Sequence, residues 1–299
     1  MPDNSIYKIR QRLSSISIRK AAIYTLLSLL PFLFIFLMLG VTETLSGLHL
    51  ELLSGITVYI LPLILIWYAF HKKDLSLTPV LLKNKAHLKD LLMVVPLMMF
   101  AFGVTWVTIL LLNFIDSDLA QGYLDFLNNI SFLQTSADTP LTDYILIFIA
   151  VALLPPLLEE IVFRGAIIER LGRKYGFKTA VLLSSVIFGF LHADILGALF
   201  MGLILSVIYL KTYSLFIPIA IHAINNGLIV LFIYIDDQFL QVEPWDTIDS
   251  FISTGWMGVL LFVISSFWIA IYLKQNWEII HQREPIENNL SNDSERLTE

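Results

Sequence analysis

Six ionisable or amide side chains lie inside three of the long apolar segments of this sequence. Such residues are rare at membrane depth, because Arg, Lys or Asp at the centre of a spanning helix costs roughly 2.5–3.5 kcal/mol on insertion scales. Carboxylates, imidazoles and amides together could activate water and stabilise an oxyanion, or bind a divalent metal ion. The six residues are Glu159, Glu160 and Arg164 in "LLEEIVFRG", His192 in "FGFLHAD", and His222 and Asn226 in "IAIHAINNG".

The two adjacent glutamates are expected to have different roles. Glu160 and Arg164 are four positions apart, so they share a helix face and can form an ion pair. Glu159 is rotated by about 100° from Glu160 on a helix with about 3.6 residues per turn, and it has no partner on its own helix. A buried carboxylate without a local partner is a candidate general base.

Two prolines, Pro155 and Pro156, precede the glutamates and are expected to interrupt the helix. If the helix restarts there, Glu159 and Glu160 lie in its first turns, near unpaired N–H groups and the positive end of the helix dipole. Broken helices at membrane depth are tolerated where they line a cavity.

His222 and Asn226 are also four positions apart, so one helix face presents an imidazole and an amide that could orient a carbonyl or stabilise an oxyanion. The depths of the candidate residues follow from a rise of about 1.5 Å per residue, counted from the inner ends of their helices. They are roughly 15 Å for Glu159, 12 Å for His222, 18 Å for Asn226 and 21 Å for His192. These depths are compatible with one cluster.

Each residue alone has an ordinary structural explanation. A single histidine or asparagine in a membrane helix more often makes an interhelical hydrogen bond than it takes part in catalysis. The combination of a carboxylate, two histidines and an amide on three helices favours a catalytic or ion-handling site. In the first of two possible chemistries, Glu159 and His192 polarise a water molecule, and His222 and Asn226 bind the oxyanion.

In the second chemistry, Glu159, His192 and His222 bind a zinc ion and leave one position open. Metalloproteases of that kind usually carry H-E-x-x-H on one helix, and the sequence has no such motif. The version without a metal or another cofactor is therefore the expected one.

The composition indicates an all-α, polytopic membrane protein. Of the 299 residues, 57% are hydrophobic and 15% are charged, whereas soluble domains have about 25% charged residues. There is no cysteine, which excludes disulfides and thiolate metal sites. About eight membrane-spanning helices are predicted, at 21–42, 53–70, 91–115, 143–168, 178–194, 196–211, 214–235 and 254–274.

The distribution of charge predicts the orientation in the membrane. With the N-terminus inside, all 19 Lys and Arg residues fall on the inner side or, for Arg164, in the fourth span, and the outer loops carry acidic residues instead. An even number of spans returns the C-terminus to the inside. The polar tail at 276–299 is expected to be disordered.

Three motifs occur in a characteristic order. "EEIVFR" (159–164) fits E-E-x-x-x-R, "FGFLH" (188–192) fits F-x-x-x-H, and "HAINN" (222–226) fits H-x-x-x-N. Over about residues 140–235 the chain resembles the CAAX protease and bacteriocin-processing (CPBP) family, the Abi-type group that includes the type II CAAX prenyl endopeptidases. The resemblance implies an intramembrane glutamate-type endopeptidase, in which Glu159 and His192 activate the water and His222 and Asn226 form the oxyanion hole.

The same resemblance implies that Glu160, Arg164 and Phe188 support the catalytic residues. It also leaves the zinc alternative open, since older descriptions of the family call such enzymes metalloproteases. The expected partners are a membrane protein or peptide substrate and the lipid bilayer, with no nucleic acid. A bacterial plasma membrane is the expected location. The residues leave two other functions open, namely a non-catalytic bacteriocin-immunity or membrane-peptide-binding protein and a proton-coupled transporter.

The chain is expected to divide into five parts, which differ in composition. These are a basic cytoplasmic N-terminus (1–20), N-terminal spans with an outer loop (21–139), the catalytic helical core (140–235), an outer loop with the last span (236–275), and the polar tail (276–299).

Overall fold

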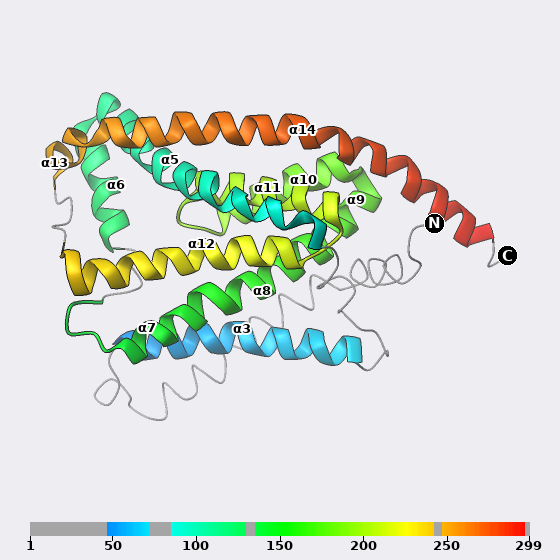
Figure 1. The fold of residues 1–299 in the computed structure, drawn as a ribbon, viewed down its shortest axis with the longest axis horizontal. Helices are drawn as coiled ribbons and strands as arrows, with labels where there is room; N and C mark the ends of the chain where they lie inside the picture. Colours follow the sequence, from blue (N-terminus) through cyan, green and yellow to red (C-terminus); the bar gives the residue numbers. More distant parts are fainter. Residues whose placement is uncertain (1–46, 72–84, 130–134, 242–246, 297–299) are drawn as a thin grey trace.

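The computed structural model describes residues 47–71, 85–129, 135–241 and 247–296, and within these ranges it contains helices and no strand. Helices α3, α12 and α14 lie lengthwise along the molecule (Figure 1). The α-helices are α3 (Gly47–His71), α5 (Val94–Ile115), α6 (Ser117–Asn129), α7 (Leu141–Ile147), α8 (Leu154–Glu160), α9 (Glu169–Tyr175), α10 (Phe177–Phe190), α11 (Ile195–Thr212), α12 (Phe216–Ile235), α13 (Ile248–Ser253) and α14 (Gly255–Arg296). Lys85–Met93 forms the 3-10 helix η2, and three segments are π-helical: η3 (Phe148–Leu153), η4 (Ile161–Ile168) and η5 (Asp236–Leu240).

The helices are long and apolar enough to form a multi-pass membrane bundle, which confirms the all-α membrane class. In the described part of the chain, five helices are long enough to span a bilayer, and Ile56–Tyr68 and Phe177–Phe190 are shorter apolar helices. The five are Leu88–Ile115, Leu141–Tyr175, Ile195–Thr212, Phe216–Leu240 and Gly255–Glu278. The span predicted at 21–42 lies outside the described residues, so the total of eight and the side of the termini stay predictions.

Helix α11 lies at the centre of the bundle. Of its most apolar 18-residue window, 72% is buried by other helices, against 17% for α14 at the periphery. Ile204, Leu205 and Ile208 of α11 are fully buried and belong to the main apolar cluster, which also takes in residues of α5, η4, α10 and α12. The elements that carry Arg164, Phe188 and His222, which are η4, α10 and α12, therefore pack against one common helix.

The segment Leu141–Tyr175 stays helical through Pro155 and Pro156, so the expected restart of the helix is wrong. The π-helix η3 ends directly before α8, and the N–H of Leu154 donates to the carbonyl of Ile149, five positions back. This wider turn accommodates the proline rings and missing N–H groups without ending the helix. The two glutamates lie at the end of α8 rather than at a free helix N-terminus.

Helices α10 and α11 form a tight hairpin, with residues 191–194 between them. The 14 residues of α10 extend over about 21 Å at about 1.5 Å per residue, less than the roughly 30 Å of a bilayer core. Asp194 caps α11, because its Oδ1 accepts a hydrogen bond from the N–H of Gly197 at 2.9 Å. Helix α10 by itself is therefore too short to cross the bilayer core.

Helix α14 continues to Arg296, across most of the segment for which the polar composition predicts disorder. This end of the helix extends away from the bundle (Figure 1). Glu recurs in this segment and is a good helix former, so local propensity contributes to the helix there.

The close approach of α5 and α14 yields a first prediction. A Cβ atom at Gly103 would lie 2.5 Å from the backbone nitrogen of Phe262, so Gly103→Ala forces the two helices apart. We expect a loss of about 1–3 kcal/mol in the free energy of unfolding, measured by thermal unfolding in detergent. Gly122→Ala in α6 is the matched control, because nothing lies within 4 Å of its Cβ and alanine favours helix. Equal melting temperatures for the two variants would contradict this packing.

Candidate active site

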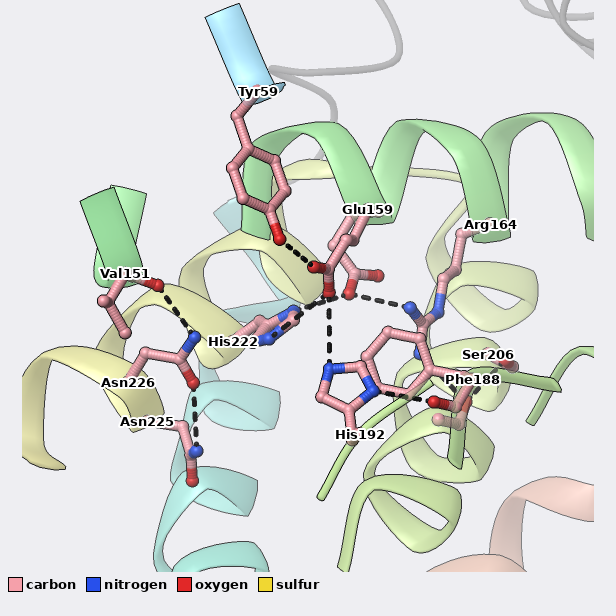
Figure 2. Close-up of polar contacts among 12 residues, drawn as sticks. Tyr59, Val151, Glu159, Arg164, Phe188, His192, Ser206, His222, Asn225 and Asn226 are labelled. Carbon is pink, nitrogen blue, oxygen red and sulfur yellow. Dashed lines mark hydrogen bonds and ion pairs between the residues drawn. The ribbon is translucent and has the colours of Figure 1, made fainter. Parts of the chain in front are cut away.

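Glu159, His192 and His222 meet at one point (Figure 2). Glu159 lies near the end of α8, His192 in the turn after α10, and His222 in the first half of α12. The Nε2 atom of His192 is 3.7 Å, and that of His222 is 4.0 Å, from the same atom, Oε2 of Glu159. The structure thus brings together the three residues that similar depths had suggested as neighbours.

His192 is oriented by the backbone of its own helix. Its Nδ1 lies 2.7 Å from the carbonyl oxygen of Phe188, and a carbonyl can only accept, so Nδ1 carries a proton and donates. In the neutral ring, Nε2 then has a free lone pair directed towards Glu159. The 3.7 Å separation is too long for a direct hydrogen bond, and it allows one water to contact both atoms at about 2.8 Å from each.

Glu160 makes the predicted ion pair with Arg164, with 2.8 Å between Oε1 and Nη1. Both side chains are fully buried, and Arg164 also donates from Nη2 to the carbonyl of Gly202 at 3.2 Å. A further contact was not predicted: Nδ1 of His222 lies 3.0 Å from the same Oε1 of Glu160. The adjacent glutamates are therefore distinct, because Glu160 joins Arg164 to His222 and Glu159 faces the two Nε2 atoms.

Phe188 packs against three members of this group. Its fully buried ring lies 4.4 Å from the ring of His192 and edge-on to His222 at 5.8 Å, as measured between centroids. The guanidinium of Arg164 lies over the same ring at 4.7 Å. Phe188 thus restricts the rotation of both imidazole rings and makes a cation–π contact with the buried arginine.

Asn226 lies one turn beyond His222 on α12, but its amide faces η3 rather than Glu159 (Figure 2). Its Nδ2 donates to the carbonyl of Val151 at 3.0 Å. In a helix that carbonyl would accept from position 155 or 156, and both are prolines without an N–H. Asn226 therefore satisfies a carbonyl that the prolines leave unpaired, and it has one N–H remaining for any oxyanion.

Tyr59 of α3 was not among the predicted site residues. Its hydroxyl donates to Oε1 of Glu159 at 3.3 Å, from a helix 100 positions earlier in the chain. The sequence did offer evidence for this contact, because Tyr59 lies in the middle of the apolar run "ITVYILPLI". A buried tyrosine hydroxyl usually has a hydrogen-bond partner.

The zinc alternative requires tighter spacing than the site has. Zinc bonds of about 2.0–2.1 Å in a tetrahedral arrangement hold neighbouring ligand atoms about 3.3 Å apart. The separations from Oε2 of Glu159 are 3.7 Å to His192 and 4.0 Å to His222. In the described ranges, no group of three or more His, Cys, Asp or Glu side chains is arranged to hold a metal ion. As arranged, these residues do not fit zinc, and no step is derived through a metal.

Comparison with known proteins finds similarity over part of the helical region. Residues 141–228, from α7 to the middle of α12, match the family model described as "Type II CAAX prenyl endopeptidase Rce1-like". This segment is thus similar to the family that the three motifs resemble. The matched range includes every predicted catalytic and supporting residue.

Two curated bacterial proteins are similar to part of the chain. It is 36% identical over 102 residues to the Bacillus subtilis (strain 168) protein named "Putative membrane peptidase YdiL", a match to 33% of this chain and 38% of the relative. It is 37% identical over 100 residues to "Membrane-embedded CAAX protease MroQ" of Staphylococcus aureus (strain USA300), covering 30% of this chain and 40% of the relative. The matched region thus spans less than half of either relative.

No solved structure matches the chain significantly. The bacterial relatives and the apolar helices agree on location: this is a multi-pass bacterial membrane protein.

Removal of the arginine from this site yields a second prediction. Arg164→Ala leaves the fully buried carboxylate of Glu160 without its cation, so we expect a loss of about 3–5 kcal/mol in the free energy of unfolding and a low yield of inserted protein. Thermal unfolding in detergent measures the loss. Arg173→Ala, on an exposed side chain of α9, is the matched control. A melting temperature for Arg164→Ala equal to that of the control would show that the pair contributes little.

Proposed function

We propose that this protein is an intramembrane endopeptidase of the glutamate type, which hydrolyses peptide bonds of a membrane-associated protein or peptide. The observation that carries the proposal is the position of Nε2 of His192, with its lone pair 3.7 Å from Oε2 of Glu159. That oxygen is buried and accepts no hydrogen bond within the described part of the chain. A site that holds two acceptors this close needs a donor between them, and water fits.

In this proposal Glu159 acts as the general base. The water donates one proton towards Oε2 of Glu159 and the other towards Nε2 of His192, which directs an oxygen lone pair away from both groups. Proton transfer to Glu159 accompanies attack of the water oxygen on the carbonyl carbon. When the tetrahedral intermediate collapses, the C–N bond breaks and Glu159 returns the proton to the leaving amine. The products are a carboxylate terminus and an amine terminus.

His222 would donate to the oxyanion in a protonated form. Its Nδ1 contacts a carboxylate oxygen of Glu160, which can only accept while ionised, so Nε2 carries a hydrogen only when His222 is an imidazolium. Asn226 would contribute its remaining N–H.

The apolar helices around the site and the names of the relatives support a membrane-associated substrate. A site between α8, α12 and the short α10–α11 hairpin receives peptide that already lies in or against the bilayer. The printed names of the two relatives, a membrane peptidase and a membrane-embedded CAAX protease, support peptide-bond hydrolysis at a membrane. We assign no prenyl group to the substrate.

The central test uses an isosteric variant. Glu159→Gln keeps the shape of the side chain but cannot accept the proton from water, so we expect a loss of at least about 10²-fold in peptide release. Peptides released from membrane proteins of the native host are compared by mass spectrometry for wild type and variant. Peptides that depend on wild type establish the protease and name its substrate. Identical profiles, with any phenotype retained by the variant, would favour an immunity or peptide-binding protein instead.

A metal-free mechanism predicts resistance to chelation. Purified protein, dialysed exhaustively against a chelator, should keep its activity, and elemental analysis should find less than stoichiometric zinc. Loss of activity on dialysis with recovery at one equivalent of zinc would overturn the metal-free version and restore the zinc alternative.

A further inference from the structure

Glu159 has two oxygen atoms in different surroundings. Oε1 accepts a hydrogen bond from the hydroxyl of Tyr59 at 3.3 Å, whereas Oε2 faces His192 and His222. A carboxylate without such a bond can exchange its two oxygens by rotation of the terminal torsion, which has a broad energy profile. A donor held on one oxygen therefore decides which oxygen faces the water.

We infer that Tyr59 is a positioning residue for Glu159: its hydroxyl holds Oε1 and thereby presents Oε2 to the reacting water. This inference rests on the proposed function. Tyr59 approaches from the side of Glu159 away from His192, so it acts on the carboxylate rather than on substrate (Figure 2). The phenol can serve as a donor here without adding a charge.

The placement of α3 supports this role. Tyr59 lies well before the segment 141–228 that matches the family model, so it is a contribution of the N-terminal half of the chain to the site. Helix α3 packs against α7, η3 and α8, the three elements that lead to Glu159. Tyr59 is largely buried among them, and its hydroxyl is the hydrogen-bond donor that the described residues supply to Glu159.

The kinetic test is Tyr59→Phe, measured on a peptide released by wild type. We expect kcat to fall by about 10-fold, the equivalent of one hydrogen bond to a charged group, while KM stays within about 2-fold. If Tyr59 had only a structural role, Tyr59→Phe would reduce the amount of folded protein and leave kcat of the folded fraction unchanged. Tyr68→Phe, on an exposed position of the same helix, is the control and should match wild type. A kcat for Tyr59→Phe equal to that of the control would overturn the inference.

A second measurement does not depend on activity. Melting temperatures are compared for wild type, Tyr59→Phe, Glu159→Ala and the double variant, as a double-mutant cycle. We expect Tyr59→Phe to lower the melting temperature in the wild-type background and to change it little when Glu159 is already alanine. Equal shifts in both backgrounds would refute the contact. If wild type and Glu159→Gln release the same peptides, the proposed function fails, and the cycle alone decides whether Tyr59 holds Glu159.

Discussion

The buried carboxylate of Glu160 is the interaction on which the rest of the site depends. One of its oxygens receives both Nη1 of Arg164, at 2.8 Å, and Nδ1 of His222, at 3.0 Å. Three elements, α8, η4 and α12, are joined through this atom. Without it Arg164 would be a buried cation with no partner carboxylate and His222 would be free to rotate, so the geometry around Glu159 depends on its neighbour Glu160.

The two prolines in the first turn of α8 also affect the neighbouring helix α12. They leave the carbonyl of Val151 without a donor from its own helix, and Asn226 of α12 supplies one. The π-turn η3 keeps the segment helical, so Glu159 and Glu160 remain in register with Arg164 one turn later. A backbone carbonyl that the irregular helix leaves unpaired thus accepts a hydrogen bond from a side chain of a neighbouring helix.

Residue spacing along single helices was sufficient to predict part of this site. The Glu160–Arg164 pair follows from a spacing of four positions, and the depths along the helices were compatible with a cluster of Glu159 and the two histidines. The contact between Glu160 and His222, the bond from Asn226 to Val151 and the approach of Tyr59 all depend on which helices are neighbours and how each is rotated. No pattern within one segment encodes these rotations. The continuation of the helix through Pro155 and Pro156 was missed for a related reason, since a π-turn is stabilised by tertiary contacts as much as by its own sequence.

In the proposed mechanism the two adjacent glutamates have different roles: Glu160 stabilises the structure, and Glu159 acts as the general base. The most direct measurement is the melting temperature of Glu159→Gln and of Glu160→Gln, each reconstituted in the same lipid nanodiscs. Glu160→Gln should melt well below wild type, because the charge that Arg164 and His222 share is lost. Glu159→Gln should melt at or above wild type, because stability is often lower where a charge is kept for function. A decrease for Glu159→Gln as large as that for Glu160→Gln would contradict the division of roles.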